Sequence, residues 1–167
     1  MKRKILGIFL VRVFTEGKKF EDMLRKKVIV DTNALLIPGE FGVDIFEELE
    51  RLGYEHVIVP EAVLSELDRL RRRPDLKGKE KRAAKIGHSL VLKYVHEEHD
   101  GCMVTINKEE EESGGQERER DVDELIVKMA LTLKAAVLTS DEPLRRKLSK
   151  AGIATVYLRG KSRLEEK

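Results

Sequence analysis

The sequence predicts an α/β fold, a three-layer α/β/α sandwich around a mostly parallel sheet of about five strands. Three observations support this prediction. Short runs of β-branched and aliphatic residues alternate with segments whose apolar residues recur at helical spacing. The chain has 167 residues, a length that suits a single domain. Hydrophobic residues make up 41% of the chain, which is enough to build a core and excludes disorder over most of its length.

The first predicted strand is Val28–Val30, an all-β-branched run of the kind found in buried parallel strands. The segment Asp44–Leu52 places apolar residues at helical spacing and is followed by Gly53, a residue typical of helix C-termini. A strand followed by a helix is the start of a βα unit.

The second unit begins with a predicted strand at His56–Val59. Pro60 follows it, and proline is tolerated at a helix start because the first N–H groups of a helix have no partner within it. We therefore predict a helix over Glu61–Arg72, which Pro74 ends.

A long helix is predicted over Lys79–Glu97, and a third strand over Met103–Ile106. We expect the buried face of this helix to consist of four residues at helical spacing, with lysine and arginine on the rest of its surface. These four residues are Ala83, Ile86, Leu90 and Tyr94. The following segment, Lys108–Arg120, has no apolar residue to pack and is predicted to be a solvated loop.

The remaining predicted elements alternate to the end of the domain. In chain order they are a helix at Asp123–Lys134, a strand at Ala136–Thr139, a helix at Glu142–Ala151 and a strand at Ala154–Leu158. We interpret residues 1–26 as an N-terminal extension, 27–159 as the folded domain and 160–167 as a polar, frayed tail.

The charge and cysteine content of the chain exclude some classes of protein and predict where the protein is located. Charged residues make up 38% of the chain, and 33 basic residues nearly balance 31 acidic ones, which argues against a simple polyanion-coating protein. Cys102 has no partner for a disulfide within the chain, so we expect a reducing, cytoplasmic location. The apolar run at residues 5–11 is interrupted by Arg12 and is far shorter than a membrane span, so we expect no membrane association.

Acidic residues follow the predicted strands at the edge where parallel α/β folds bind their ligands. Asp31 directly follows the first strand, and Asp141 follows the fourth. Glu66 lies in the helix after the second strand, and Asp123 opens the helix before the fourth. Each acid alone could be a helix cap or a surface residue. Four acids gathered at one edge would repel one another unless cations neutralised them.

Hard divalent cations suit such a cluster, because Mg²⁺ and Mn²⁺ prefer oxygen ligands. One or two ions at this edge would lower the pKa of a bound water and stabilise an in-line displacement at phosphorus. The acids therefore point to hydrolysis of phosphodiesters.

Four short stretches resemble the acidic motifs of the PIN-domain nucleases, in the order that this family shows. They are Ile29–Asn33, Val63–Leu67, Asp123–Ile126 and Leu138–Asp141. The resemblance extends from Val28 to about Arg159. The C-terminal part is more similar to the archaeal and eukaryotic branch that processes ribosomal RNA than to VapC-type toxins.

The resemblance implies a metal-dependent endoribonuclease that acts in RNA processing or as a toxin. Asp31, Glu66, Asp123 and Asp141 would hold the metal, and Asn33 and Ser140 would position the site through hydrogen bonds. Glu124 stands where some members carry a second aspartate, so it would be a ligand or a supporting residue. Asp121 competes with Asp123 for the third position, and we favour Asp123 because an apolar helix face follows it. The family also implies a homodimer.

Basic residues crowd the segment that follows Glu66 and recur in the last predicted helix. A patch beside an acidic cleft could bind RNA phosphates independently of base sequence, and a solvated surface is the alternative explanation. The candidates for RNA binding are Arg69, Arg71, Arg72, Arg73, Lys79, Arg82, Arg145 and Arg146. Possible partners besides RNA are an antitoxin or a ribosome-assembly protein.

Two other functions use the same residues differently. The first is a catalytically weak PIN-like subunit that binds RNA or supports assembly, and the four acids argue against it. The second is a haloacid-dehalogenase-type phosphatase with Asp31 as its nucleophile. That chemistry needs a second aspartate two residues later, where this chain has Asn33.

Overall fold

The computed structural model describes residues 25–76, 78–97, 101–108 and 121–167. Most of the expected N-terminal extension and of the expected loop at Lys108–Arg120 lies outside these residues. No helix in the described ranges combines the length and the apolar character needed to cross a membrane.

Six strands and six helices alternate along the described chain. The strands are β1 (Lys27–Val30), β2 (His56–Pro60), β3 (Met103–Asn107), β4 (Ala136–Leu138), β5 (Thr155–Arg159) and β6 (Arg163–Glu166). The helices are α2 (Thr32–Phe41), α3 (Ile45–Arg51), α4 (Glu61–Arg72), α5 (Lys79–His96), α6 (Val122–Leu133) and α7 (Glu142–Lys150).

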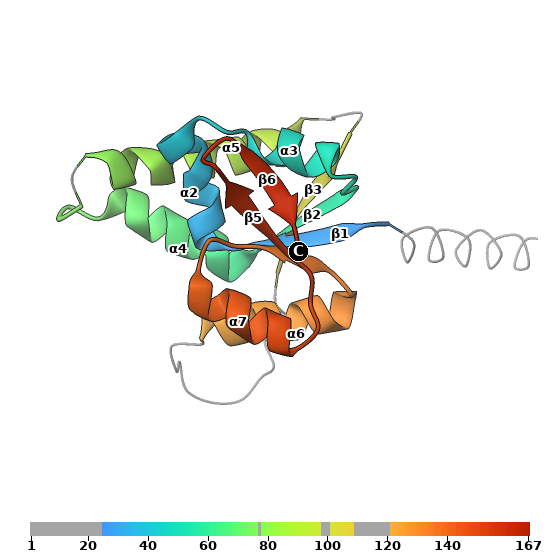
Figure 1. The fold of residues 1–167 in the computed structure, drawn as a ribbon. Helices are drawn as coiled ribbons and strands as arrows, with labels where there is room; N and C mark the ends of the chain where they lie inside the picture. Colours follow the sequence, from blue (N-terminus) through green and yellow to red (C-terminus); the bar gives the residue numbers. More distant parts are fainter. Residues whose placement is uncertain (1–24, 77, 98–100, 109–120) are drawn as a thin grey trace, which may run out of the picture.

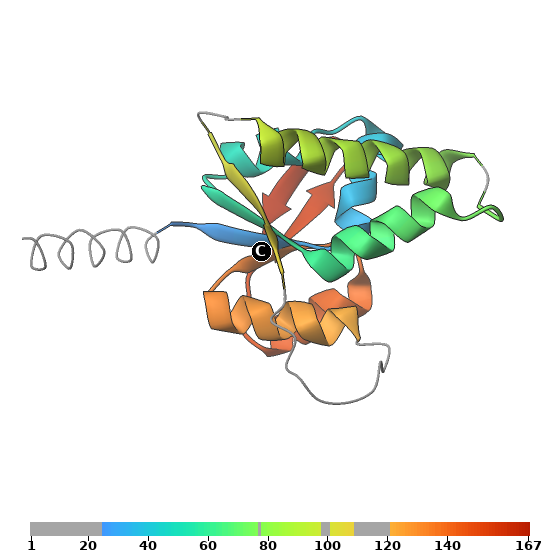
Figure 2. The same ribbon diagram turned by 180° about the vertical axis from the view of Figure 1, so that it is seen from behind.

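The strands form one sheet in the order β3-β2-β1-β4-β5-β6. All neighbours are parallel except β5 and β6, which pair antiparallel. Helices α6 and α7 cover one face of the sheet, and α2 to α5 lie over the other (Figures 1 and 2). The predicted three-layer α/β/α sandwich is therefore confirmed, with six strands where about five were expected.

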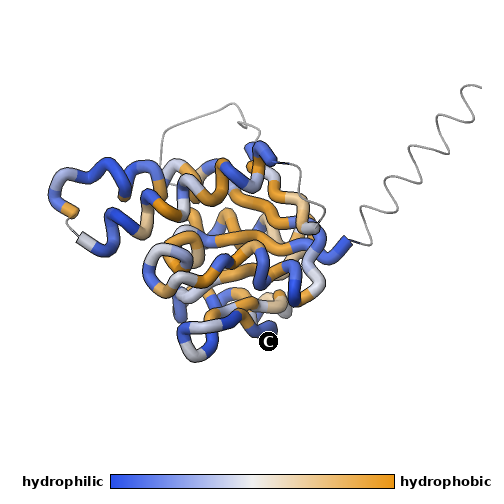
Figure 3. The backbone as a smooth tube through the Cα atoms, turned by 90° about the horizontal axis from the view of Figure 1, so that it is seen from above, coloured by the Kyte–Doolittle hydropathy of each residue, from blue (hydrophilic) through white to orange (hydrophobic). Residues whose placement is uncertain are grey.

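The core lies on both faces of the central strands. Val28, Ile29 and Val30 of β1 are completely buried, as expected for a central strand of a parallel sheet. Figure 3 shows hydrophobic residues concentrated in the strands, whereas the connection between α4 and α5, at the left, is hydrophilic.

Helix α2 is an element that the sequence analysis did not predict. It contains Pro38 and Gly39, a pair that normally marks a turn. Tertiary packing explains why the helix continues, because α2 crosses α5 at very close range. A Cβ atom on Gly39 would lie 2.3 Å from Ala83 Cα, and one on Gly87 would lie 2.0 Å from the Leu35 carbonyl oxygen. Only glycine fits at these two crossing points.

The same crossing corrects the predicted face of the long helix α5. Ala83 is buried as predicted and Leu90 and Tyr94 are partly buried, but Ile86 is 41% exposed. The residues of α5 that are fully buried include Ala84, Gly87 and Val91. The prediction for Ile86 was wrong because small residues, which permit the close approach to α2, occupy the buried face.

The C-terminal segment is a strand, so the expectation of a frayed tail was wrong. Leu164 of β6 is completely buried, and its backbone N–H donates to Glu48 Oε2 at 2.8 Å. Glu166 accepts hydrogen bonds from Lys26 Nζ and from Tyr54 Oη, both at 2.6 Å. These contacts tie the end of the chain to residues more than a hundred positions earlier.

Candidate active site

The acidic residues gather at the carboxyl edge of the sheet, where β1 lies between β2 and β4. The chain builds β2 and β3 on one side of β1 and then crosses to build β4 and β5 on the other. Such a reversal of strand order opens a crevice beyond the carboxyl ends of the strands, which is where open α/β sheets bind ligands. Asp31 and Asp141 follow the two strands that flank this crevice.

Asp31 is the most buried of the candidate acids, with 5% of its surface exposed. Its Oδ2 accepts a hydrogen bond of 2.7 Å from the Thr139 hydroxyl, and the Thr32 backbone N–H also donates to its carboxylate. The Thr139 hydroxyl in turn accepts from the Asp141 backbone N–H at 3.0 Å. Thr139 therefore joins the segments that carry Asp31 and Asp141.

Glu66 reaches the same edge from α4. It is half-buried, and its Oε2 accepts a hydrogen bond of 2.7 Å from the Thr32 hydroxyl. Because Thr32 directly follows Asp31, this single residue holds two of the four acids, one through its backbone and one through its side chain.

Asp121 and Asp123, the two candidates for the third ligand position, have different roles at the N-terminus of α6. Asp121 is the N-cap residue, and its carboxylate accepts from the Asp123 backbone N–H at 3.1 Å. Asp123 is half-buried in the first turn of the helix and lies within electrostatic range of Asp141 and Glu66. Lys147 Nζ stands 3.6 Å from Asp121 Oδ2 and 4.0 Å from Asp123 Oδ2. Asp121 thus has a capping role, whereas Asp123 belongs to the cluster.

The electrostatics reflect this crowding of like charges. The pKa of Asp31 is raised, with burial as the largest cause. The hydrogen bond from Thr139 acts in the opposite direction and lowers this pKa, whereas repulsion from Asp123 and Asp141 raises it. Burial also raises the pKa of Asp123, with added repulsion from Asp121, Asp141 and Glu66. The like charges around Asp31 and Asp123 disfavour the ionised form of these two acids, and a cation placed beside them would favour it.

The chemistry of these donors fits a hard divalent cation, because every candidate ligand is an anionic carboxylate oxygen. In the described part of the chain, no group of three or more His, Cys, Asp or Glu side chains is arranged so that it could hold a metal ion. Thr32 and Thr139 hold one carboxylate oxygen each of Glu66 and Asp31. Asp31, Glu66, Asp123 and Asp141 are the predicted ligands, and their binding of an ion stays a prediction.

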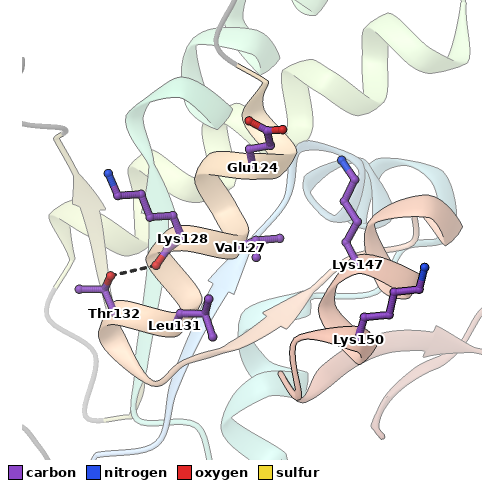
Figure 4. A pocket seen from close by; sticks show the side chains of 7 residues that line it. All are labelled: Glu124, Val127, Lys128, Leu131, Thr132, Lys147 and Lys150. Carbon is purple, nitrogen blue, oxygen red and sulfur yellow. Dashed lines mark hydrogen bonds between the residues drawn. The ribbon is translucent and has the colours of Figure 1, made fainter.

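Glu124 directly follows Asp123 in α6 and lines a separate hollow. It is exposed, and the hollow of about 620 Å³ lies between α6 and α7 (Figure 4). Val127 and Leu131 contribute apolar surface, and Leu131 is 55% exposed. Lys147 also lines this hollow, so its ammonium group connects the hollow with Asp121 and Asp123.

Asn33 and Ser140, the two expected positioning residues, are brought together on another side of the acids. Both are exposed and line a hollow of about 310 Å³ formed by α2 and the ends of β4 and β5. No hydrogen bond joins either side chain to the four acids among the described residues. The predicted role of these two residues in positioning the acids therefore stays a prediction.

Most of the arginines expected to bind RNA are already paired with acids on their own segments. Arg71 and Arg72 pair with Asp68, and Arg73 pairs with Asp75. In α7, Arg145 and Arg146 approach Glu142 at 3.4 Å and 3.6 Å. Such exposed pairs contribute little stability and can be exchanged for phosphate contacts at small cost. No such pair involves Arg69, Lys79 or Arg82 in the described ranges.

Sequence reasoning placed Thr139 and Thr32 in two of the motifs but gave neither residue a role. Both are buried polar residues beside a catalytic candidate, at 0% and 5% exposure. A sequence signal was present, because each threonine closely follows an apolar strand: Thr32 comes directly after Asp31, and Thr139 comes two residues before Asp141.

Comparison with known proteins agrees with this architecture. The family described as PIN like domain matches residues 28–161. The solved structure of the PIN domain endonuclease Utp24 superposes with a TM-score of 0.60 at 18% identity, covering 84% of this chain and 90% of that one. A domain of a functionally unknown protein from Methanocaldococcus jannaschii superposes with a TM-score of 0.54 at 24% identity, covering 81% and 92%. A search of curated proteins found no match.

Proposed function

This chain belongs to the PIN-like domain family, and on that premise we propose that it is a metal-dependent endoribonuclease. The observation that carries the proposal is the clustering of four carboxylates at the switch point of the sheet, with Asp31 buried among like charges. A buried carboxyl group with a raised pKa costs stability in the folded protein unless a ligand compensates for it. Buried carboxyl groups with a raised pKa are typical of catalytic and ligand-binding sites.

The residues of the chain have separate roles in the proposed reaction. The hydroxyl groups of Thr139 and Thr32 orient Asp31 and Glu66 by donating a hydrogen bond to one carboxylate oxygen of each. Asp123 and Asp141 complete the ligand set. A bound Mg²⁺ or Mn²⁺ ion would activate a water molecule and neutralise the charge that develops on the phosphate.

RNA is the proposed substrate, held by cationic side chains outside the acidic crevice. Arg69, Lys79 and Arg82 lie around the projecting connection between α4 and α5, and α4 also carries Glu66. Phosphates contacting this surface would place the backbone across the acids. Binding of this kind is steeply dependent on salt.

We propose a role in RNA processing, including that of ribosomal RNA, with a toxin-type ribonuclease as the second possibility. The similarity to a PIN domain endonuclease supports the first role. A homodimer and a cytoplasmic location complete the proposal, the latter because Cys102 is a buried free thiol.

The test is cleavage of labelled structured and single-stranded RNAs with Mn²⁺, Mg²⁺ or EDTA. The wild type should cleave with either metal, stop in EDTA and leave 5′-phosphate ends, because water and not the ribose hydroxyl attacks. Asp31→Asn and Asp141→Asn should reduce cleavage by about a hundredfold or more, whereas the control Glu47→Gln, at an exposed acid of α3, should not.

Two results would contradict the proposal. Cleavage that persists in EDTA or in both aspartate variants would exclude the acidic site as its source. RNA binding without cleavage under any metal would favour the catalytically weak, RNA-binding subunit.

A further inference from the structure

We propose that the hollow beside Asn33 and Ser140 binds one nucleobase of the RNA and prefers guanine. This inference rests on the proposed function, because it places the base next to the phosphate at the acidic site. The hollow measures about 310 Å³, at the lower end of small-molecule pockets and sufficient for a purine.

The position of the hollow relative to the acids is fixed by two short backbone segments. Asn33 lies two residues after Asp31, and Ser140 directly precedes Asp141. Both residues line the hollow, so part of its lining comes from the same chain segments that carry two of the four acids. A nucleoside attached to a phosphate at the acids would therefore have its base within reach of the hollow.

The walls of the hollow suit a flat aromatic ring. Leu36 and Ile37, which are buried, and Leu158, which is partly buried, supply apolar lining. Phe41, the last residue of α2, also lines the hollow and is 39% exposed. An exposed phenyl ring beside apolar lining is a surface on which a base can stack.

The charge of the residues that line the hollow favours an uncharged base over an anionic phosphate. Among the described residues, no lysine or arginine lines the hollow, and its one charged residue is Glu40. The carboxylate of Glu40 repels phosphate, so the backbone of the RNA is better placed at the acids and their cation. The hollow itself is left for an uncharged group.

Glu40 and Asn33 also provide a basis for selecting the base. An ionised carboxylate only accepts hydrogen bonds. Guanine offers two adjacent donors, its ring N–H and its amino group, whereas uracil offers one N–H between two carbonyl oxygens that the carboxylate would repel. The amide of Asn33 can both donate and accept, so it can satisfy the neighbouring oxygen of guanine. The lining therefore favours guanine most and uracil least.

Binding can be tested without any cleavage. The full-length Asp31→Asn chain, labelled with ¹⁵N, is titrated with guanosine 5′-monophosphate and with uridine 5′-monophosphate while amide signals are followed by NMR. Guanosine monophosphate should shift the signals of Phe41 and Leu158 and bind about tenfold or more tightly than uridine monophosphate. Equal affinity for the two nucleotides, or shifts confined to other surfaces, would overturn the inference.

Variants separate stacking from base selection. Phe41→Ala should weaken guanosine monophosphate about tenfold, and Phe41→Leu, which keeps apolar surface but loses the ring, should weaken it nearly as much. Glu40→Gln should reduce the difference between the two nucleotides, while the control Glu47→Gln on α3 leaves it unchanged. Unchanged binding in Phe41→Leu, with its amide spectrum intact, would also overturn the inference.

A cleavage assay on RNA with randomised sequence distinguishes this inference from the proposed function. Cleavage without base preference, together with unchanged binding in the Phe41 variants, would refute the base pocket and leave the nuclease. Selective guanosine binding in a wild type that cleaves no RNA with any metal would refute the nuclease and leave the pocket.

Discussion

Replacing Thr139 by valine tests the network that positions the acids. The substitution removes a single hydroxyl and nearly keeps the size of the side chain. That hydroxyl is completely buried, donates to Asp31 Oδ2 at 2.7 Å and accepts from the Asp141 N–H at 3.0 Å. In the variant, a buried carboxylate loses a donor and a backbone N–H loses its acceptor.

The expected magnitude follows from these two losses. A buried polar group left without a partner costs about 1–3 kcal/mol, so the two losses in Thr139→Val should lower the free energy of unfolding by about 2–6 kcal/mol. The hydrogen bond from Thr139 also lowers the pKa of Asp31, so its loss raises that pKa further. A carboxyl whose pKa is raised by folding loses stability as it ionises, so the deficit of the variant should grow from pH 4 to pH 7.

The assay is urea unfolding followed by circular dichroism at these two pH values. Thr139→Ser is the matched control, because it keeps the hydroxyl and loses one methyl group, which costs about 0.8 kcal/mol. If the valine and serine variants unfold at the same urea concentration at both pH values, the proposed role of the hydroxyl is refuted.

Three further substitutions probe the site and the fold. Asp31→Asn should raise the free energy of unfolding at pH 7 by about 0.5–2 kcal/mol, because burial raises the pKa of Asp31. This gain should disappear below about pH 3, where Asp31 is protonated in both the folded and the unfolded state. A variant that is less stable than the wild type in thermal unfolding at pH 7 would contradict this prediction. Lys147→Met should tighten Mn²⁺ binding by up to about fivefold in calorimetry, because the substitution removes an ammonium group 4.0 Å from Asp123 Oδ2. Weaker Mn²⁺ binding by this variant would contradict the prediction and indicate that Lys147 helps the acids to bind the ion. Gly87→Ala should lower the free energy of unfolding by about 1–3 kcal/mol or more, because its Cβ would lie 2.0 Å from the Leu35 carbonyl oxygen; an unchanged urea midpoint would refute the close crossing of α2 and α5.

The sequence was sufficient to predict the alternation of strands and helices and the edge at which the acids lie. Both follow from local information, since β-branched runs form buried strands and parallel strands share one carboxyl edge. Asp31 and Asp141 could be placed at that edge because Asp31 directly follows β1 and Asp141 comes soon after β4.

The features that were missed depend on contacts between distant parts of the chain. Helix α2 continues through Pro38 because it packs against α5, and no local pattern shows that packing. The strand β6 looks polar in sequence, but Leu164 is buried under contacts from α3. The roles of Thr32 and Thr139 became visible only when the hydrogen bonds to Glu66 and Asp31 were seen.

Titration of Mn²⁺ into the wild type, Asp31→Asn and the control Glu47→Gln, followed by calorimetry, tests the central claim most directly, because it requires no knowledge of the RNA substrate. The wild type and Glu47→Gln should bind one or two ions with equal affinity, and Asp31→Asn should bind at least about tenfold more weakly. Equal binding by all three proteins, or no binding by any of them, would contradict the assignment of the acidic edge as the metal site of a nuclease.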